Sequence, residues 1–248
     1  MLKVERYSII LDEIRAYNSV KSSKLCDILQ VSEDTIRRDL NELEEKGQLK
    51  KVHGGAMALS YIPSFVKREV QEIQTKHIVA KKAVNLIEDG NVLIIDGGTS
   101  NLQLVNLLPD DKKLTIFTNS IPVASKLCEY SNIDGVLLGG NILRKGHTTI
   151  GYAAVEFLQE IHADIFFLGI TSVDAENGLT EANRQETTIK KAMLKASKTV
   201  VSMVISNKLN SRQSYKVGDI NALDVMVTEL DPEDEILMPY KIKGIRVL

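Results

Sequence analysis

The chain has 248 residues, of which 44% are hydrophobic and 26% are charged, an ordinary composition for a globular protein of one large or two smaller domains. Its formal net charge of −2 excludes an overall basic field, so any nucleic-acid binding requires a local basic patch. No apolar run reaches the roughly 18 residues of a membrane helix, and the start MLKVERYSII does not resemble a signal peptide, so a soluble, cytoplasmic protein is expected.

Two helices are predicted at the start of the chain. The side chains expected on the buried face of the first recur at helical spacing and are Tyr7, Ile10, Leu11, Ile14 and Tyr17. Asn18 and Ser19 end this pattern. The stretch SSKLCDIL (22–29) then predicts a second helix, which Ser22 or Ser23 would cap.

A third helix and a hairpin complete the predicted N-terminal module. A three-residue turn leads to Ser32, a good N-cap for a helix that buries Ile36, Leu40 and Leu43. The residues that follow alternate as a strand does and reach a Gly-Gly turn. This order of elements is typical of a winged helix-turn-helix, and we assign residues 1–57 to it.

The third helix leaves Thr35, Arg37, Arg38 and Asn41 on its outer faces, within the turns that a recognition helix places in the major groove. Arginine donates bidentately to guanine, and threonine reaches phosphate or base. The alternative is an ordinary solvated helix in which Arg38 only pairs with a carboxylate four residues away, worth tenths of a kcal/mol. The module carries as many acidic as basic side chains, so it has no net positive charge. DNA binding therefore depends on whether the basic residues are gathered on one face. The predicted DNA contacts are Ser22, Ser23, Lys24, Ser32, Thr35, Arg37, Arg38, Asn41, Lys50, Lys51 and His53.

A family resemblance adds to this interpretation. Arg6, Ile10 and Ile14, followed by Ser32 and the segment TIRRDL (35–40), closely resemble the N-terminal signature of DeoR-type transcriptional regulators, with no gap. The resemblance implies a DNA-binding regulator, more often a repressor than an activator. A winged helix that binds protein and has no role on DNA is the alternative.

A second block of the chain predicts a different fold. Residues 58–74 contain Pro63 and little periodicity and indicate a linker, followed by a domain at 75–248. That domain opens with a helix at 76–87, and its apolar runs are mostly continuous, as expected of strands covered by helices on both faces. Strands are expected at 92–95, 114–117, 135–140, 164–170, 199–205 and 222–228, with helices at 100–108, 123–130, 153–161 and 181–197. The alternation predicts a Rossmann-like, doubly wound α/β sheet.

Three loops follow strands at what should be one edge of this sheet. IIDGGTSN (94–101) runs from a strand through a glycine turn into a helix, which exposes backbone N–H groups and two hydroxyls to an anion. The loops at 118–120 and 139–146 should reach the same edge, where ligands of open α/β sheets collect, and Arg144 could neutralise a phosphate there. The alternative is that the glycines only permit a tight turn. The convergence favours a small phosphorylated ligand.

The second block also resembles the effector domain of DeoR-type regulators, which is similar to ribose-5-phosphate isomerase. The whole resemblance covers about residues 4–228. It implies that a sugar phosphate or related metabolite binds this domain and modulates DNA affinity. The effector contacts that it implies are Asp96, Gly97, Gly98, Thr99, Ser100, Thr118, Asn119, Gly139, Gly140, Arg144, Glu186, Lys190 and Lys208.

One departure from the family pattern stands out. Ile205 occupies the place where the family usually has an aspartate shortly before the lysine at Lys208. Gly97 and Ser100 are milder departures in the glycine turn. Either the effector differs from the common ones, or Lys208 has lost its partner.

An enzyme is the strongest rival class, because the fold that this domain resembles also isomerises sugar phosphates. Asp174, Glu176, Glu186 and Lys190 could supply acid–base groups near a phosphate. The N-terminal module argues against catalysis, since an isomerase has no use for it, and we predict no catalytic residues.

Neither metal nor cofactor is predicted. The two cysteines, Cys26 and Cys128, have no CxxC spacing and suggest small buried side chains in a reducing compartment, and the four histidines are scattered. The partners expected are duplex operator DNA, a phosphorylated sugar or polyol, and further copies of the chain in a dimer or tetramer, with no membrane.

Overall fold

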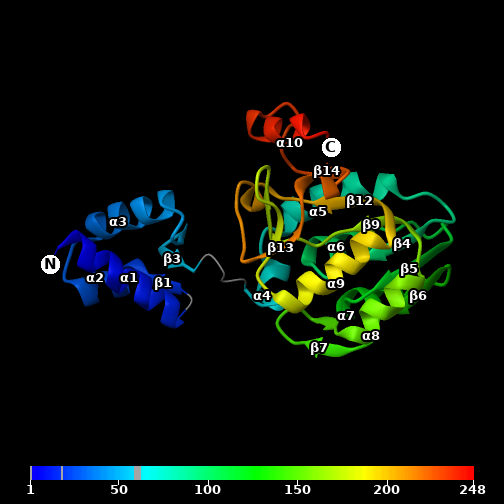
Figure 1. Ribbon diagram of the computed structural model, residues 1–248, viewed down its shortest axis with the longest axis horizontal. Coiled ribbons are helices and arrows are strands. Elements are labelled where there is room, and N and C mark those ends of the chain that lie inside the picture. The colour runs from blue at the N-terminus through cyan, green and yellow to red at the C-terminus, as the bar shows by residue number, and fades with distance from the viewer. Residues whose placement is uncertain (1, 18, 59–62) are drawn as a thin grey trace. The chain divides into compact units, whose positions relative to one another are not determined.

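The computed structural model of the protein describes residues 2–17, 19–58 and 63–248 (Figure 1). The chain forms two compact units, which divide between residues 62 and 63. Asn18 and the side chain of Tyr17, both used in the predictions above, lie outside the described part.

The boundary between the units differs from the predicted one. Of the predicted linker, residues 59–62 lie outside the described part, whereas Phe65–Val70 form a short helix, α4, that belongs to the second unit. The ring of Phe65 is buried in the core of that unit. A single apolar anchor has no periodicity, which is why the local pattern indicated only a linker.

In the first unit, the described residues form a three-helix bundle and a small antiparallel sheet. The elements are α1 (Lys3–Tyr17), β1 (Ser19–Lys21), α2 (Ser22–Leu29), α3 (Glu33–Glu45), β2 (Lys50–Val52) and β3 (Gly55–Met57), with strand order β1-β3-β2. The predicted inner faces are buried together, including Ile10, Leu25, Ile36 and Leu40. Strand β1 was not predicted, because only its pairing with β3 makes three residues a strand. The winged helix-turn-helix is confirmed.

The caps of these helices are partly as predicted. Ser32 is the N-cap of α3, and its side chain accepts a hydrogen bond from the Thr35 N–H at 3.3 Å. The prediction that Ser22 or Ser23 caps α2 is wrong. The N-cap is the extended Lys21, because β1 leads directly into the helix and the Ser22 N–H donates to Gly54 O in the hairpin turn at 2.8 Å.

The described part of the second unit contains a seven-stranded parallel sheet that includes all six predicted strands. The strands are β4 (Val92–Ile95), β5 (Leu114–Thr118), β6 (Ile133–Leu137), β9 (Ala163–Phe167), β12 (Ser197–Met203), β14 (Val225–Val227) and β15 (Arg246–Val247). Their order is β15-β14-β12-β9-β4-β5-β6. The chain starts in the middle at β4, runs outward to β6, and returns to β9 on the other side of β4. This doubly wound order has its switch point between β4 and β9, where ligands of such folds bind.

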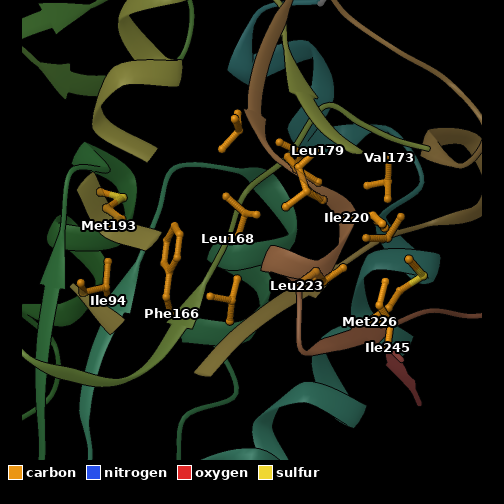
Figure 2. Close-up of a cluster of buried hydrophobic side chains, with 14 of the residues drawn as sticks. Ile94, Phe166, Leu168, Val173, Leu179, Met193, Ile220, Leu223, Met226 and Ile245 are labelled. Atoms are coloured by element: carbon orange, nitrogen blue, oxygen red, sulfur yellow. The ribbon is translucent and has the colours of Figure 1, made fainter. Parts of the chain in front are cut away.

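Helices cover both faces of the sheet, as the continuous apolar strands predicted. On one face, α8 (Tyr152–Phe157), α9 (Arg184–Lys195) and α10 (Met238–Ile242) pack on a cluster that includes Ile94 and Phe166 (Figure 2). On the other face, α5 (Ile73–Ala83), α6 (Thr99–Val105) and α7 (Ile121–Leu127) pack with the neighbouring residues Leu93, Ile95 and Phe167. Alternate side chains of each strand therefore point into the two cores. The loops that were predicted to bind a ligand follow the carboxyl ends of the strands.

Two antiparallel additions were not predicted. One is the hairpin β7 (Asn141–Leu143) and β8 (Thr148–Ile150), part of which was expected to be loop. The other is the sheet β10 (Ser172–Asp174), β11 (Gly178–Glu181) and β13 (Tyr215–Gly218). Because Glu181 ends β11, helix α9 starts only at Arg184, after the N-cap Asn183, and the predicted helix at 181–197 is too long at its start.

Cys26 is half-buried, but Cys128 is exposed at the end of α7, so the prediction of a buried thiol there is wrong. Across the described residues, no helix has the length and apolar character to span a bilayer. The same residues hold no group of three or more His, Cys, Asp or Glu side chains suited to a metal ion.

Candidate nucleic-acid interface and effector site

The two arginines at the centre of α3 are exposed and weakly held. Arg37 Nη2 lies 3.1 Å from Asp34 Oδ1, and Arg38 Nη2 lies 3.8 Å from Asp34 Oδ2, with more than 60% of each of the three side chains exposed. Exposed ion pairs of this kind contribute about 0–1 kcal/mol. Both guanidinium groups can therefore exchange Asp34 for a phosphate or a base edge at little cost, so the pairs seen here do not compete with DNA binding.

The wing is attached to the same helix. Lys51 Nζ donates to Asn41 Oδ1 at 2.5 Å, and the Lys51 N–H donates to Glu44 Oε1 at 2.7 Å. Near the start of α3, the hydroxyls of Ser32 and Thr35 lie 3.0 Å apart. The structure thus brings Asn41 and Lys51 together, and it uses Ser32 and Thr35 to form the helix start.

The other predicted DNA contacts lie at the start of α2 and in the wing. Lys24 is exposed, and its Nζ lies 2.7 Å from Glu13 Oε2 on α1. His53 is exposed in the turn between β2 and β3, and Lys50 is exposed at the start of β2. None of the eleven predicted contacts, all within the described residues, is buried.

At the switch point of the second unit, three chain segments approach so closely that glycine is required. A Cβ on Gly169, after β9, would lie 1.9 Å from Gly97 O, and a Cβ on Gly97 would lie 2.3 Å from Thr148 Cγ2 on β8. Gly98 has φ +143°, which side chains rarely adopt. Close packing of distant segments thus accounts for Gly97 and Gly169, a reason other than the tight turn of the alternative interpretation, and the case for a ligand depends on the side chains around them.

Two predicted residues at the end of β5 contact these loops: Thr118, the last residue of the strand, and Asn119, which follows it. Asn119 Oδ1 accepts from the Gly97 N–H at 3.2 Å, and Asn119 Nδ2 donates to Thr149 O on β8 at 3.3 Å. Thr118 Oγ1 donates to Ile95 O at 2.5 Å. Both side chains are buried and have partners within the protein, so they organise the edge of the sheet.

A buried cluster of charges lies at the same edge. Lys190, on α9, forms an ion pair with Asp96 and donates to Gly169 O at 2.8 Å, and Glu181 Oε2 lies 3.8 Å from the same Nζ. Burial by itself would lower the pKa of Lys190, but the carboxylates of Asp96, Glu181 and Glu186 together raise it above its ordinary value. Lys190 therefore stays charged, and one lysine balances several carboxylates.

Two groups near this cluster titrate close to neutrality. Burial, with the negative charges of Glu181 and Asp96, raises the pKa of Glu186 to about 7, although Lys190 and Arg68 oppose the shift. Burial, followed by the positive charge of Arg68, lowers the pKa of Lys208 to about 8. Values displaced toward neutrality are typical of functional sites.

Two buried hydroxyls in the described segments lack a hydrogen-bond partner. In the described part of the protein, Ser100 Oγ and Thr148 Oγ1 are buried and have no hydrogen-bond partner. A Cβ on Gly146 would lie 2.8 Å from Glu186 Oε1 and 3.1 Å from Thr148 Oγ1, so both side chains lie next to that glycine. Buried hydroxyls without a partner are rare because they lose hydration without compensation. A polar ligand would satisfy them.

Not all predicted effector residues join the buried cluster. Arg144 is exposed in the β7–β8 turn, and Gly139 and Gly140 are exposed ahead of β7. Three residues that the sequence did not single out do lie at the cluster: Arg68, Glu181 and Thr148. Arg68 was assigned to the linker and Glu181 to a helix, so the only local signal for them was their charge.

Comparisons with known proteins agree with the two-part architecture. Residues 6–61 match the DeoR-like helix-turn-helix domain, and residues 71–230 match the DeoR C-terminal sensor domain. The chain is 31% identical to the HTH-type transcriptional regulator GlpR of Haloferax volcanii, over 92% of this chain and 91% of that protein. It is 28% identical to the glycerol-3-phosphate regulon repressor of Escherichia coli K12, over 96% and 95% of the two chains.

Among solved structures, the chain is similar to ribose 5-phosphate isomerase A of Methanocaldococcus jannaschii, with a TM-score of 0.42 and 20% identity over 56% of this chain and 55% of that one.

Proposed function

Because the chain belongs to the DeoR family of transcriptional regulators, we propose that it binds operator DNA through α3 and the wing and responds to a phosphorylated sugar or polyol bound at the switch point. One observation carries the effector part of this proposal. Ser100 and Thr148 bury hydroxyls without partners at the sheet edge where ligands of doubly wound folds bind, and Thr148 lies near Glu186 of the charged cluster.

The chemistry of the edge supports a ligand with both an anionic group and hydroxyls. Lys208 carries a positive charge for much of the neutral range, and the two free hydroxyls can donate to phosphate oxygens. The carboxylates of Glu181 and Glu186 can accept from the hydroxyls of a sugar or polyol. A relative that is named for glycerol 3-phosphate is consistent with this class of effector.

We propose that the protein is not an enzyme. The surroundings of Asp174 and Glu176, the two acids that only the catalytic hypothesis invokes, support this. Asp174 Oδ1 accepts from the N–H groups of Glu176 and Asn177 at 3.0 and 2.7 Å, so it forms the turn between β10 and β11. Glu176 is 82% exposed. Assaying the purified protein for pentose- and hexose-phosphate isomerisation tests the point, and turnover at about 1–10³ s⁻¹ would contradict it.

In the proposed mechanism, a cytoplasmic homo-oligomer presents two winged helices to repeated half-sites on DNA and represses a carbohydrate operon. The effector binds one conformation of the sensor domain more tightly and thereby changes DNA affinity by linkage. The exposed positions of Arg37, Arg38 and His53 suit the DNA contacts that this requires.

Two measurements test the proposal. A thermal-shift screen compares phosphorylated sugars and polyols with their unphosphorylated parents, and only phosphorylated compounds should raise the melting temperature. Duplexes selected from a random library should be bound with an affinity that falls steeply as salt increases, since phosphate contacts release counterions. Salt-independent binding, or no enrichment of any sequence, would favour the protein-binding winged helix instead.

A further inference from the structure

The first helix after the linker contacts the proposed effector site. The Phe65 N–H of α4 donates to Lys145 O at 3.0 Å, and the Phe65 ring stacks on His147, with centroids 5.1 Å apart and planes inclined by 18°. Both contacts are with the β7–β8 turn, which also contains Gly146, beside Glu186 and Thr148. Helix α4 therefore packs against the turn that borders the site.

Glu69 and Arg68 of α4 are both partly buried, and Arg68 lies close enough to the charged cluster for Glu186 and Glu181 to act on it. Arg68 is half-buried, its Nε donates to Pro63 O at 3.1 Å, and among the described residues no carboxylate oxygen comes within ion-pair distance of it. Burial lowers the pKa of Arg68. The negative charges of Glu186 and Glu181 are near enough to oppose this shift. A half-buried guanidinium with this little compensation is costly unless an anion joins it.

Lys208 is a second cation of this kind, and it is tied to the same region. Asn207, the residue before it, donates to the Glu72 carboxylate at 2.8 and 3.0 Å, and Glu72 is the N-cap of α5, just after α4. Ile205 and Phe65 belong to one buried cluster, so Ile205 fills core where the family usually has an acid. Within the described residues, the ammonium group of Lys208 has neither an ion pair nor a hydrogen bond.

On the basis of the proposed function, we propose that Arg68 and Lys208 form the subsite for the anionic group of the effector. The bound ligand would then act directly on α4. Two neighbouring cations that have no ion-pair partner among the described residues repel each other, and a phosphate between them would remove that repulsion and pair both. Arg68 is a residue of the segment that leads to the DNA-binding unit. An effector held by Arg68 thus acts on that segment without a relay through the sheet.

The backbone of α4 is well placed to transmit the change. Lys76 Nζ, on α5, donates to the carbonyls of Arg68 and Gln71, so the end of α4 is fastened to α5. Its start is fastened to the β7–β8 turn through Phe65. A ligand that draws Arg68 toward Lys208 acts between these two attachments, and α4 is the first helix after residue 63, where the second unit begins.

The test uses the full-length chain and inorganic phosphate as the probe, titrated calorimetrically at constant ionic strength with chloride as the reference ion. Arg68→Ala should lower phosphate affinity about tenfold or more, as expected for losing a charge-assisted hydrogen bond. Lys67→Ala, which removes an exposed charge from the same helix, should bind as the wild type does. Arg68→Lys should retain part of the affinity, because it keeps the charge and loses the planar fork.

Circular dichroism and thermal melting show whether Arg68→Ala is folded, and if it is not, Arg68→Gln replaces it because the longer side chain keeps most of the packing. Phosphate binding by a folded Ala or Gln variant at wild-type affinity would overturn this inference and leave the proposed function standing. Failure of the wild type to bind phosphate or any phosphorylated sugar or polyol in the screen would instead remove the proposed function and this inference with it.

A second readout concerns the coupling to DNA. With a selected duplex, the compound found in the screen should change the DNA affinity of the wild type and of Lys67→Ala. Arg68→Ala should keep the basal DNA affinity and lose this response. An undiminished response in Arg68→Ala at the same compound concentration would overturn the inference.

Discussion

Arg6 and Asp39 join α1 to α3 by two parallel hydrogen bonds, from Nε to Oδ2 at 2.6 Å and from Nη2 to Oδ1 at 2.9 Å. Only 14% of the Arg6 side chain and 3% of the Asp39 side chain is exposed. Asp39 is the acid of TIRRDL, adjacent to Arg38 in the sequence, but it is buried whereas Arg38 is exposed. The pair therefore sets how α3 is held on the bundle, while the arginines beside it stay available on the surface.

Replacing Asp39 by Asn should destabilise the first unit by about 2 kcal/mol, because it removes one charge of a bidentate pair and leaves Arg6 poorly satisfied. Urea denaturation followed by far-UV circular dichroism measures the change. Glu45→Gln, at an exposed position on the same helix, should stay within about 0.5 kcal/mol of the wild type. Equal stability of the two variants would show that the pair does not hold α3.

Arg37→Ala should weaken binding to a selected duplex by about 1–3 kcal/mol, the range expected for a lost base-edge contact. The pair with Asp34 gives little stability, so folding should hardly change. Fluorescence anisotropy at fixed salt measures the affinity, with Lys81→Ala in the second unit as a control of equal charge change. If Arg37→Ala binds DNA as tightly as that control, the face of α3 that contains Arg37 is wrongly assigned to DNA contact.

Thr148→Val should leave the free protein as stable as the wild type or more stable. Oγ1 is buried without a partner in the described structure, and valine replaces it with a methyl group of similar shape. The same change should lower effector affinity about two- to tenfold, because the ligand loses a hydrogen bond. Thermal melting with and without the compound from the screen measures both effects. A clear loss of stability without ligand would mean that the hydroxyl has a structural partner.

The pKa of Glu186, about 7 in the folded protein, gives a prediction for stability against pH. Because this folded-state pKa lies above the ordinary value of 4.5, the contribution of Glu186 to stability is present at acid pH and is lost as pH rises through about 7. The charged groups acting on it are Lys190, Glu181, Asp96 and Arg68.

Glu186→Gln should therefore melt near the wild-type temperature at pH 5 and above it at pH 8, because glutamine carries no charge to bury. Glu160→Gln, at an exposed position, should show no such change between the two pH values. A difference between Glu186→Gln and the wild type that is the same at both pH values would contradict the assignment.

How far each part could be predicted depends on the range of the interactions that create it. The three N-terminal helices and the six main strands come from periodicity and from caps such as Ser32, which involve residues a few positions apart. Strand β1 and the hairpin β7–β8 could not be found this way, because three residues become a strand only when a distant partner supplies hydrogen bonds.

The sequence by itself determined the division into an N-terminal helical module and an α/β domain, the amphipathic third helix, the alternation of helices and strands, and the family signature, because each of these depends on residues that are close together in the sequence. The tertiary structure alone decided which charges meet. Lys190 and Asp96 are 94 positions apart and form an ion pair, and Arg68, in the segment predicted to be a linker, lies close enough to Lys208 for its charge to add to burial in lowering the pKa of that lysine. Burial and charge depend on everything that surrounds a group in space, so the displaced pKa values and the unpartnered hydroxyls exist only once the chain is folded.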